Sequence, residues 1–301
     1  MNCKHLIFAA AAAGVFLYGS TRVLADTAVL GSAQNFAVLG GSTVTNTGST
    51  TIQGDVGLSP GTSITGQGPG SDQILLTGAY HIGDTPAITA KNDLTTAYNA
   101  LASLARTATL TGQDLGGGRT LTPGVYFFAS SAQLTGALTL DAQGANNAYW
   151  VFQIGSTLTT ASGSSVLATN FGSNKGSDAG VFWQVGSSAT LGTGTAFEGN
   201  ILASASITLN TSATIENGRA LAMTGAVTMD TNTISNVCLN NLDSQGRPGP
   251  GFSGGLVFEN GKLVAVPLPS ASLLGGCGLA VLLVGRFRRW VRRLRDQRMC
   301  S

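Results

Sequence analysis

Charged side chains are scarce in this chain, and their scarcity excludes several classes of function. Asp, Glu, Lys and Arg together make up 10% of the 301 residues, and histidine occurs only twice. Between Asp26 and Val266, acidic residues outnumber basic ones by 13 to seven, because most of the arginines lie near the C-terminus. A body with net negative charge argues against nucleic acid as a partner, since phosphate recognition requires a basic surface.

Cysteine is almost missing from the body of the chain. Cys3, Cys277 and Cys300 lie near the two ends, which leaves Cys238 alone. One cysteine cannot form an internal disulfide, and no Cys or His spacing typical of a metal site occurs. No Gly-rich segment has the lysine of a phosphate-binding loop either. The sequence therefore predicts neither a metal nor a cofactor.

Glycine is abundant, with 42 residues, and a short threonine-containing phrase is repeated. In the stretch 181–234 an apolar-Thr-apolar triplet recurs every 18 to 20 residues. A repeat of this length with little charge is typical of stacked coils, in which each coil adds one strand to each of several sheets. We therefore predict a mostly β fold, specifically a β-solenoid.

The repeated phrase places threonines at matching points of successive coils. Because side chains alternate between the two faces of a strand, the apolar residue of each phrase is expected to point inward and its threonine outward. The inward set is Leu140, Leu158, Leu191, Leu209 and Met229. The outward set is predicted to form one file of Thr139, Thr157, Thr190, Thr208 and Thr228 and a second of Thr193, Thr211 and Thr231, with Thr195, Thr214 and Thr233 nearby. Threonine also occurs in strands through β propensity alone, so the sequence leaves open which of these residues share one face.

Only one stretch of the body has a helical pattern. From about Thr85 to Thr107, apolar residues recur at steps of three and four, and Pro86 stands where a first helical turn tolerates it. An amphipathic helix has to bury its apolar stripe. We expect it to pack lengthwise along one face, over the apolar strands 148–154 and 180–185. A strand is also expected at 51–56, and a capping loop at 66–83.

Both ends of the chain are predicted to be targeting segments. Residues 1–25 combine a lysine near the start, an apolar run and a cleavage site with small residues, which predicts a secretory signal peptide.

A Gly- and Pro-rich linker at 241–265 leads to residues 266–301, where a Val-Pro-Leu-Pro motif precedes an apolar run and an arginine cluster. That order resembles the C-terminal sorting signals of Gram-negative bacteria, which an exosortase processes, in a variant with Ser270 at its last position. The apolar helix implies transient or permanent membrane contact, and a permanent anchor is the alternative to processing. Export to the medium or the cell surface is expected.

The body, residues 26–240, contains a set of motifs that identify a family. They are Leu-Gly-Ser-Ala-Gln-Asn-Phe-Ala-Val-Leu at 30–39, Gly-Asp-Val-Gly-Leu-Ser-Pro-Gly-Thr-Ser-Ile at 54–64, Asp-Leu-Thr-Thr-Ala-Tyr-Asn at 93–99, Leu-Thr-Pro-Gly-Val-Tyr at 121–126, Phe-Gln-Ile-Gly-Ser-Thr-Leu at 152–158, Phe-Trp-Gln-Val-Gly at 182–186, Gly-Asn-Ile-Leu at 199–202 and Gly-Arg-Ala-Leu at 218–221. In these the chain resembles the bacterial and fungal ice-binding proteins, which have a discontinuous right-handed β-solenoid and an attached helix.

The resemblance implies that the N-terminal coil lies beside the last coil. It also implies that a flat, helix-free face rich in Thr, Ser, Ala and Gly binds the surface of an ice crystal. Threonine suits that role because its χ1 angle is stiff and because stacked strands repeat it about every 4.8 Å.

Two other functions remain open at this point. One is adhesion at the cell surface or in an extracellular polymer matrix, on the same fold without ice affinity. The other is a polysaccharide-active enzyme, which would need clustered carboxylates or a base. Asp141, Glu198, Glu216 and Asp230 are spread singly through the repeat, and His81 lies beside the capping loop. We therefore expect no enzymatic activity.

Overall fold

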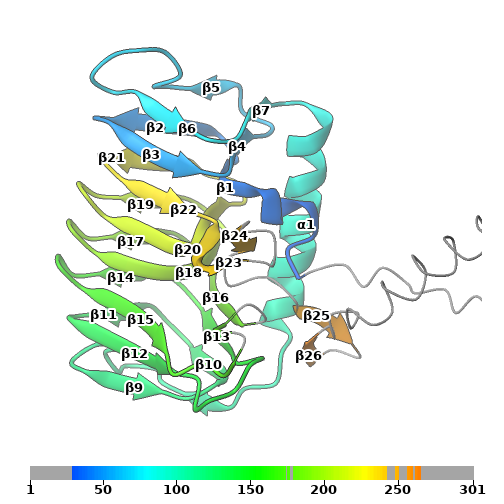
Figure 1. The fold of residues 1–301 in the computed structure, drawn as a ribbon, viewed down its shortest axis with the longest axis vertical. Helices are drawn as coiled ribbons and strands as arrows, with labels where there is room; N and C mark the ends of the chain where they lie inside the picture. Colours follow the sequence, from blue (N-terminus) through cyan, green and yellow to red (C-terminus); the bar gives the residue numbers. More distant parts are fainter. Residues whose placement is uncertain are drawn as a thin grey trace, which may run out of the picture.

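The computed structural model describes residues 29–173, 175–176, 179–242, 248–250, 256–259 and 262–265. The predicted signal peptide and sorting segment lie outside these residues. The described chain is mostly β, with parallel sheets and one α-helix (Figure 1), in agreement with the expected fold class. Within this part of the chain, no helix has both the length and the apolar character needed to cross a bilayer.

One sheet has seven short parallel strands. In spatial order they are β11 (Ala132–Leu134), β14 (Leu158–Thr160), β17 (Ala189–Leu191), β19 (Ile207–Leu209), β21 (Val227–Asp230), β2 (Thr43–Thr47) and β5 (Ser63–Ile64).

The second sheet has 15 strands and bends into two faces. The first, here called the glutamate face, contains β9 (Arg119–Leu121), β12 (Ala137–Asp141), β15 (Ser165–Thr169), the first parts of β18 (Ala196–Ala203) and β20 (Thr214–Ala222), β22 (Thr233–Ser235), β3 (Thr50–Gln53) and β6 (Ile74–Leu76). The second, the helix face, contains β8 (Ala108–Thr109), β10 (Gly124–Phe128), β13 (Tyr149–Ile154), β16 (Gly180–Val185), the later parts of β18 and β20, β1 (Phe36–Gly40), β4 (Asp55–Leu58) and β7 (Tyr80–Ile82). The register of β18 against β20 shifts at the bend, where Gly199 has a φ of 99°.

Coils that are neighbours in space are not always neighbours in sequence. The N-terminal strands lie directly on the last coil: Leu39 pairs with Leu221, Thr45 with Thr228 and Thr51 with Thr233. The coil of residues 55–82 lies beyond them and forms one end of the stack, while β8, β9 and β11 form the other (Figure 1). The predicted side-by-side placement of the first and last coils is therefore confirmed.

Buried Arg219 fixes this junction between the first and last coils. Its side chain is 1% exposed. Its Nε donates to the carbonyl of Gln34 at 2.9 Å, and its Nη1 donates to Oδ1 of Asn200 at 2.7 Å. Asn236 Nδ2 adds a bond to the carbonyl of Asn35 at 3.0 Å. The junction is thus held by polar groups that satisfy one another around the buried Arg219 side chain.

The helix α1 (Thr85–Ala102) returns the chain from one end of the stack to the other (Figure 1). Asp84 caps it by accepting the N–H of Ala87 at 3.0 Å, and Pro86 occupies the first turn. The helix ends five residues before the predicted Thr107. Eighteen helical residues span about 27 Å at roughly 1.5 Å each, whereas the strands of the helix face extend over about 38 Å at roughly 4.8 Å each. The residues after Ala102 must therefore extend to reach β8.

One stripe of the helix packs on the sheet. Its buried residues are Ala87, Ala90, Leu94, Ala97 and Leu101. Val151 and Phe182, from the two predicted apolar strands, are fully buried in the same cluster as Leu94 and Leu101. Gln153 Nε2 also donates to the carbonyl of Leu101 at 2.8 Å and to that of Leu104 at 3.0 Å. The helix therefore covers this face, and small alanines allow its backbone to approach the strands.

Stacked aromatic rings fill the interior of the coils that contain β10, β13, β16 and β18. The rings of Phe152 and Trp183 lie 3.8 Å apart and nearly parallel, with Tyr126 on one side and Phe197 on the other. The five predicted inward residues of the repeat are all buried, with at most 1% exposed. Rigid rings in successive coils keep the surrounding sheets in fixed positions.

Besides the end of the helix, two sequence expectations about boundaries, at 51–56 and at 66–83, are wrong. The predicted strand 51–56 is two strands, β3 and β4, separated by Gly54 with a φ of 127°. The predicted capping loop 66–83 contains β6 and β7. The predicted linker 241–265 contains β24 (Pro248–Pro250), which pairs with β23 (Val237–Leu242), and the hairpin of β25 (Leu256–Glu259) and β26 (Lys262–Ala265).

Candidate functional site

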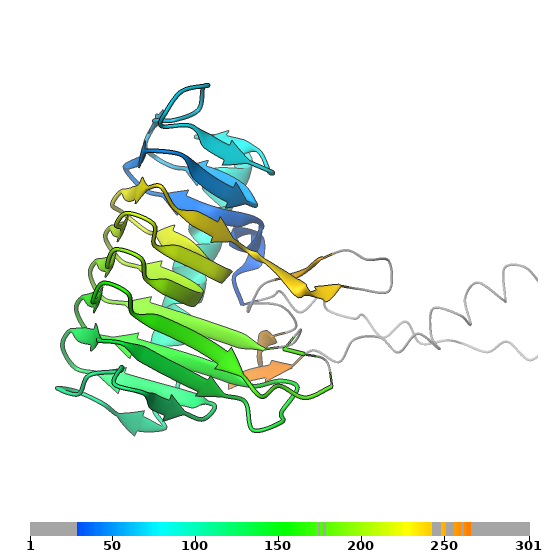
Figure 2. The ribbon, with the colours of Figure 1, turned by 60° about the vertical axis from the view of Figure 1, so that its left-hand side comes forward.

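The faces of the stack differ in what they offer to a partner. The helix face is covered by α1, so its outward side chains are buried or partly buried. Figure 2 shows the helix behind the stacked strands, with the strands of the other two faces uncovered by any described element. A surface site for a large partner therefore has to lie on the seven-stranded sheet, on the glutamate face, or at their common corner.

The seven-stranded sheet carries a row of threonines in register. Thr159 pairs with Thr190, Thr190 with Thr208, Thr208 with Thr228, and Thr228 with Thr45. Each is half-buried or exposed and stands between two buried neighbours. Because paired strands lie about 4.8 Å apart, the hydroxyl and methyl groups repeat at that step. The pairing confirms that Thr190, Thr208 and Thr228 form one file.

A second row of small side chains runs beside the first. Thr157 Oγ1 donates to Ser131 Oγ at 2.8 Å. Ser188 Oγ accepts the N–H of Ser206 at 3.3 Å. These contacts along the row restrict the hydroxyl-bearing side chains to fixed rotamers. We call two rows of outward residues of this sheet the threonine face: Gln133, Thr159, Thr190, Thr208, Thr228 and Thr45 in one row, and Ser131, Thr157, Ser188, Ser206, Ala226, Thr43 and Ser63 in the other. None of these residues is charged. The next outward pair of the same sheet, Thr47 and Asp230, brings one carboxylate to its edge beside the corner.

Two members of the first predicted file do not belong to it. Thr139 lies in β12 on the glutamate face, where it pairs with Thr120 and Leu167. Thr157 lies in the second row of the threonine face, and Thr159 occupies the position predicted for it. The sequence step was misleading because each coil carries threonine in more than one strand. The 18-residue interval from 139 to 157 joins two different sheets.

The second predicted file lies at the corner between the two open faces, and only part of it is aligned. Thr193 and Thr211 are exposed there, and the carbonyl of Thr211 accepts the N–H of Gly194 at 3.0 Å. In the next coil the residue aligned with Thr211 is Asp230 and not Thr231, because the carbonyl of Asp230 accepts the N–H of Ser212 at 3.1 Å. Thr231 is therefore aligned with Ser212, and the φ angles of Thr231 and Ser212 are both positive, 54° and 61°. The corner of the coil that contains Thr231 is one residue shorter than that of the coil that contains Thr211.

Thr195 is wrongly predicted as a surface contact. It is fully buried, and its hydroxyl lies 2.8 Å from that of Thr160 and donates to the carbonyl of Ala161 at 3.3 Å. The chain has already turned inward at this point of the corner. Thr214 is on the surface, but it pairs with Ala196 and Thr233 on the glutamate face.

The glutamate face is open but chemically mixed. One of its rows is uncharged and consists of Ala137, Ser165, Ala196, Thr214, Thr233, Thr51 and the exposed Leu75. The next row contains Leu167, which is 55% exposed, and Glu198 paired with Glu216. Burial raises the pKa of Glu198 to about 7, the N–H of Ala168 opposes that shift, and the charge of Glu216 adds to it. These two carboxylates were predicted to stand singly, and the structure places them side by side.

The other carboxylates of the repeat bond to groups of their own turn or of a neighbouring coil. Asp141 Oδ1 accepts the N–H of Gln143 at 2.9 Å, and this bond together with Asn170 lowers the pKa of Asp141. Asp230 accepts the hydroxyl of Thr211. His81 Nδ1 lies 2.7 Å from Asp84, the helix N-cap. Over the described residues, no three His, Cys, Asp or Glu side chains gather as a metal site would require.

Known proteins match this chain over most of its length. The sequence profile of the ice-binding-like family matches residues 38–235. The chain is 52% identical over 269 residues to an ice-binding protein of Nostoc sp. (strain HG1), a match that covers 88% of this chain and 90% of that protein. It is 34% identical over 228 residues to an ice-binding protein of Flavobacterium frigoris (strain PS1), with 70% and 76% covered.

Solved structures agree with the sequence matches. An ice binding protein from an Antarctic biological consortium is 50% identical, with a TM-score of 0.63 over 69% of this chain and 91% of that one. The ice-binding protein of the Antarctic ascomycete Antarctomyces psychrotrophicus is 43% identical, with a TM-score of 0.62 over 69% of this chain and 98% of that one. The profile match and the relatives together establish the family: this chain belongs to the ice-binding-like family.

Proposed function

We propose that the chain adsorbs to ice through the threonine face and thereby inhibits ice growth and recrystallisation, without turning over a substrate. The names of the relatives support ice as the ligand. The choice of face is carried by one observation: the seven-stranded sheet presents two parallel rows of small, uncharged side chains, Thr208 and Ser206 among them.

The chemistry of ice favours such a surface. Ice offers a regular array of neutral water molecules, so a matching protein needs a flat surface and a repeat. Rows about 4.8 Å apart along the stack, and residues roughly 6.6 to 7 Å apart within a strand, supply the repeat. Stiff threonine side chains hold their hydroxyls in place, while their methyl groups limit disordered water. The Glu198–Glu216 pair would retain hydration of its own, which disfavours the glutamate face.

The remainder of the fold acts as a support in this proposal. The winding is that of a right-handed β-solenoid, with α1 lying lengthwise along it. The helix contacts on the helix face and the aromatic stack hold the coils in register, and the register sets the spacing of the threonines. Rigidity in the free protein reduces the entropy that adsorption costs.

We further propose that the protein acts outside the cytoplasm. Residues 1–25 would direct export. Residues 266–301 would be cut by an exosortase-type enzyme or would remain as an anchor, so that the body is secreted or held at the surface of a Gram-negative cell. An ice-binding body at either location would meet external ice.

Ice-affinity partition tests the proposal directly. A crystal is grown slowly from a solution of the chain mixed with a labelled, similarly sized globular protein without ice affinity. The chain is expected to concentrate in the ice and to shape the crystals, while the control stays in the liquid. A folded chain that remains in the liquid and leaves crystals unshaped contradicts the proposal and favours the adhesion alternative.

A further inference from the structure

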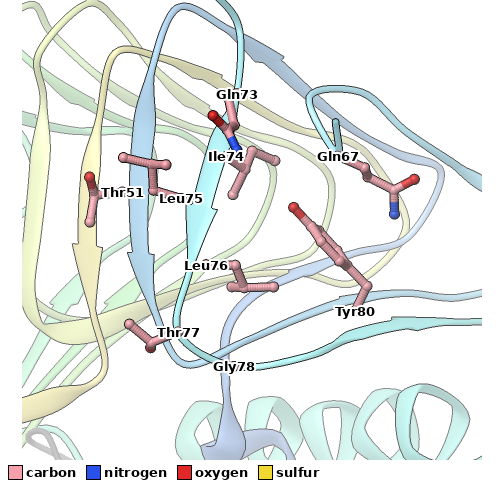
Figure 3. Close-up of a pocket in the computed structure, with 9 residues that line it drawn as sticks. All are labelled: Thr51, Gln67, Gln73, Ile74, Leu75, Leu76, Thr77, Gly78 and Tyr80. Carbon is pink, nitrogen blue, oxygen red and sulfur yellow. The ribbon is translucent and has the colours of Figure 1, made fainter. Parts of the chain in front are cut away.

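The end of the stack formed by residues 55–82 is hollowed. A cavity of about 480 Å³ lies around β6, the last strand of the glutamate face, and is lined by residues that include Thr51, Gln67, Gln73, Ile74, Leu76 and Tyr80 (Figure 3). This volume is in the range of small-molecule sites, roughly 300 to 1,000 Å³. The cavity lies at the end of the stack, whereas the threonine face lies along its side.

The lining combines an apolar wall with uncharged polar groups. Ile74, Leu76 and the ring of Tyr80 supply the wall, and the amides of Gln67 and Gln73 supply both donors and acceptors. Figure 3 shows the Tyr80 hydroxyl directed toward the strand that carries Ile74 and Leu76, with Gln67 near the ring. No residue that lines the cavity is charged.

The Tyr80 hydroxyl points to a missing partner. Its oxygen is buried, and within the described part of the chain it has no hydrogen-bond partner. Buried polar groups in folded proteins are nearly always bonded to protein, water or ligand. A ligand hydroxyl would satisfy this atom once a small shift of the cavity wall exposes it, because in this structure less than 1 Å² of the oxygen is accessible.

We infer that this cavity binds one pyranose unit of a neutral polysaccharide. A pyranose ring has an apolar C–H face, which suits the wall of Leu76 and Tyr80, and a rim of hydroxyls, which suits the two glutamine amides. An ionic ligand would meet no opposite charge in the lining. A purely apolar ligand would leave Tyr80 and the amides unsatisfied, at a cost in affinity.

A peptide strand fits this end of the stack less well. An extended peptide could add to the free edge of β6, but β6 has only three residues, about 10 Å at roughly 3.3 Å each. The neighbouring segment Gly68-Pro69-Gly70 offers no continuation of the strand. The observations therefore favour a compact ligand that enters beside β6.

The site is tested on the full chain with the methyl glycosides of glucose, galactose and mannose, by saturation-transfer NMR and titration. At least one glycoside is expected to bind weakly, with the strongest transfer at its ring C–H protons. Tyr80→Phe removes only the hydroxyl, and Gln67→Ala removes one amide. Each should weaken binding roughly three- to tenfold, as expected for one hydrogen bond. Gln113→Ala, an exposed glutamine near the opposite end of the stack, is the matched control and should change nothing.

Several results would overturn the inference. Absence of transfer from all three glycosides would do so, as would binding that Tyr80→Phe and Gln67→Ala leave unchanged. Equal binding of cyclohexanol would show that the cavity is merely apolar. Displacement of the glycosides by a short β-strand peptide, but not by a second sugar, would reassign the edge of β6 to peptide recognition. Ice partition of the same variants should equal that of the unmodified chain, so failure here leaves the proposed function untouched.

Discussion

The threonine face and the glutamate face are built by the same coils, yet they differ in chemistry. Thr208 on the threonine face and Thr214 on the glutamate face belong to one coil and lie six residues apart. Both are half-buried, and both are aligned with residues of the coils above and below. On the glutamate face, however, the next row carries Leu167 and the Glu198–Glu216 pair.

This difference shows that stacking alone does not define a site. Every face of a stack of coils acquires a regular repeat, because the strand spacing is set by backbone hydrogen bonds. A face becomes suited to an ordered, neutral partner only where no side chain protrudes or carries charge. The threonine face meets that condition in both of its rows except at Gln133, in the end strand. The glutamate face meets it only in part of one row, which ends at the exposed Leu75.

The largest effect is expected when the two faces are compared with the same substitution. Thr208→Tyr places a large ring in the middle of the threonine face. It should lower thermal hysteresis and ice partition by roughly tenfold or more, because a single protrusion separates the neighbouring rows from a flat surface. Thr190→Tyr should act alike. The measurement is ice partition together with crystal shaping, at matched concentrations of folded protein.

Thr214→Tyr is the matched control for this experiment. It introduces the same ring, from the same residue type, in the same coil, but on the glutamate face. Ice activity should remain within about twofold of the unmodified chain. Equal losses of ice activity for Thr208→Tyr and Thr214→Tyr would mean that ice contact extends around the corner. A loss of ice activity for Thr214→Tyr alone would place the ice-binding site on the glutamate face.

The second prediction concerns Arg219, which holds the coil that carries Thr45 against the coil that carries Thr228. Arg219→Met should destabilise the fold by about 3 kcal/mol, since the carbonyl of Gln34 and the buried amide of Asn200 both lose the bonds that Arg219 donates. Thermal unfolding measures this change. If the aligned rows are the site, refolded Arg219→Met at low temperature should also bind ice less well per folded molecule. Arg219→Lys keeps a charge but not the planar donor group, and should lie between the two.

The sequence was sufficient to predict the fold because its signals are local and periodic. Leu140 and Leu158, and again Leu191 and Leu209, are 18 residues apart and all four are buried. The helix pattern beginning near Pro86 has the correct start. The end of the helix could not be predicted, because it depends on the distance from Ala102 to β8. The split at Gly54 likewise depends on a corner, where a positive φ breaks one apparent strand into two.

The candidate site was less predictable from sequence. The interval between threonines identified Thr190, Thr208 and Thr228, which occupy the same position in three similar coils. The same reasoning failed at Thr231, because the corners of successive coils differ in length. The burial of Thr195 and the pairing of Glu198 with Glu216 depend on how one coil lies on the next. The sequence of a single repeat unit does not contain that information.

The third prediction uses the charge that distinguishes the glutamate face. The pKa of Glu198 is raised from 4.5 to about 7, mainly by burial. The folded state therefore favours the protonated carboxyl. The stability gained from the protonated Glu198 carboxyl is complete below pH 4.5 and is lost as pH rises through about 7. Thermal unfolding should show lower stability at pH 8 than at pH 5, and Glu198→Gln should remove most of that difference, on the order of 2 kcal/mol.

Glu216→Gln provides the control for the pH experiment. It removes the smaller influence of the neighbouring charge and should reduce the pH dependence only in part. Because the threonine face carries no titratable group, ice partition of the folded chain should be the same at pH 5 and pH 8. A pH-dependent partition that Glu198→Gln abolishes would place the glutamate face in contact with ice.

The smallest effect is expected at the corner that joins the two faces. Thr231 has a φ of 54°, a conformation that costs a β-branched residue roughly 1 to 3 kcal/mol. Gly194 occupies the equivalent place two coils away, with a φ of 64°. Thr231→Gly should remove the strain, but it also removes the exposed hydrogen bond from Thr231 Oγ1 to Asp230 Oδ1 at 3.1 Å. It increases the entropy of the unfolded chain as well, by roughly 0.5 to 1 kcal/mol. The expected net gain is about 0.5 kcal/mol, visible as a slightly higher unfolding temperature.

Thr211→Gly is the matched control for this corner. Thr211 is exposed at the same corner, one coil away, but without a positive φ, and its hydroxyl donates to Asp230. Glycine there relieves no strain and removes a hydrogen bond, so stability should fall by about 1 kcal/mol. Opposite signs for the two substitutions would show that the shorter corner of the Thr231 coil is strained. A loss of stability from both would mean that Thr231 is held there by contacts worth more than the strain. Ice partition unaffected by either would confine the site to the flat rows on one side of the corner.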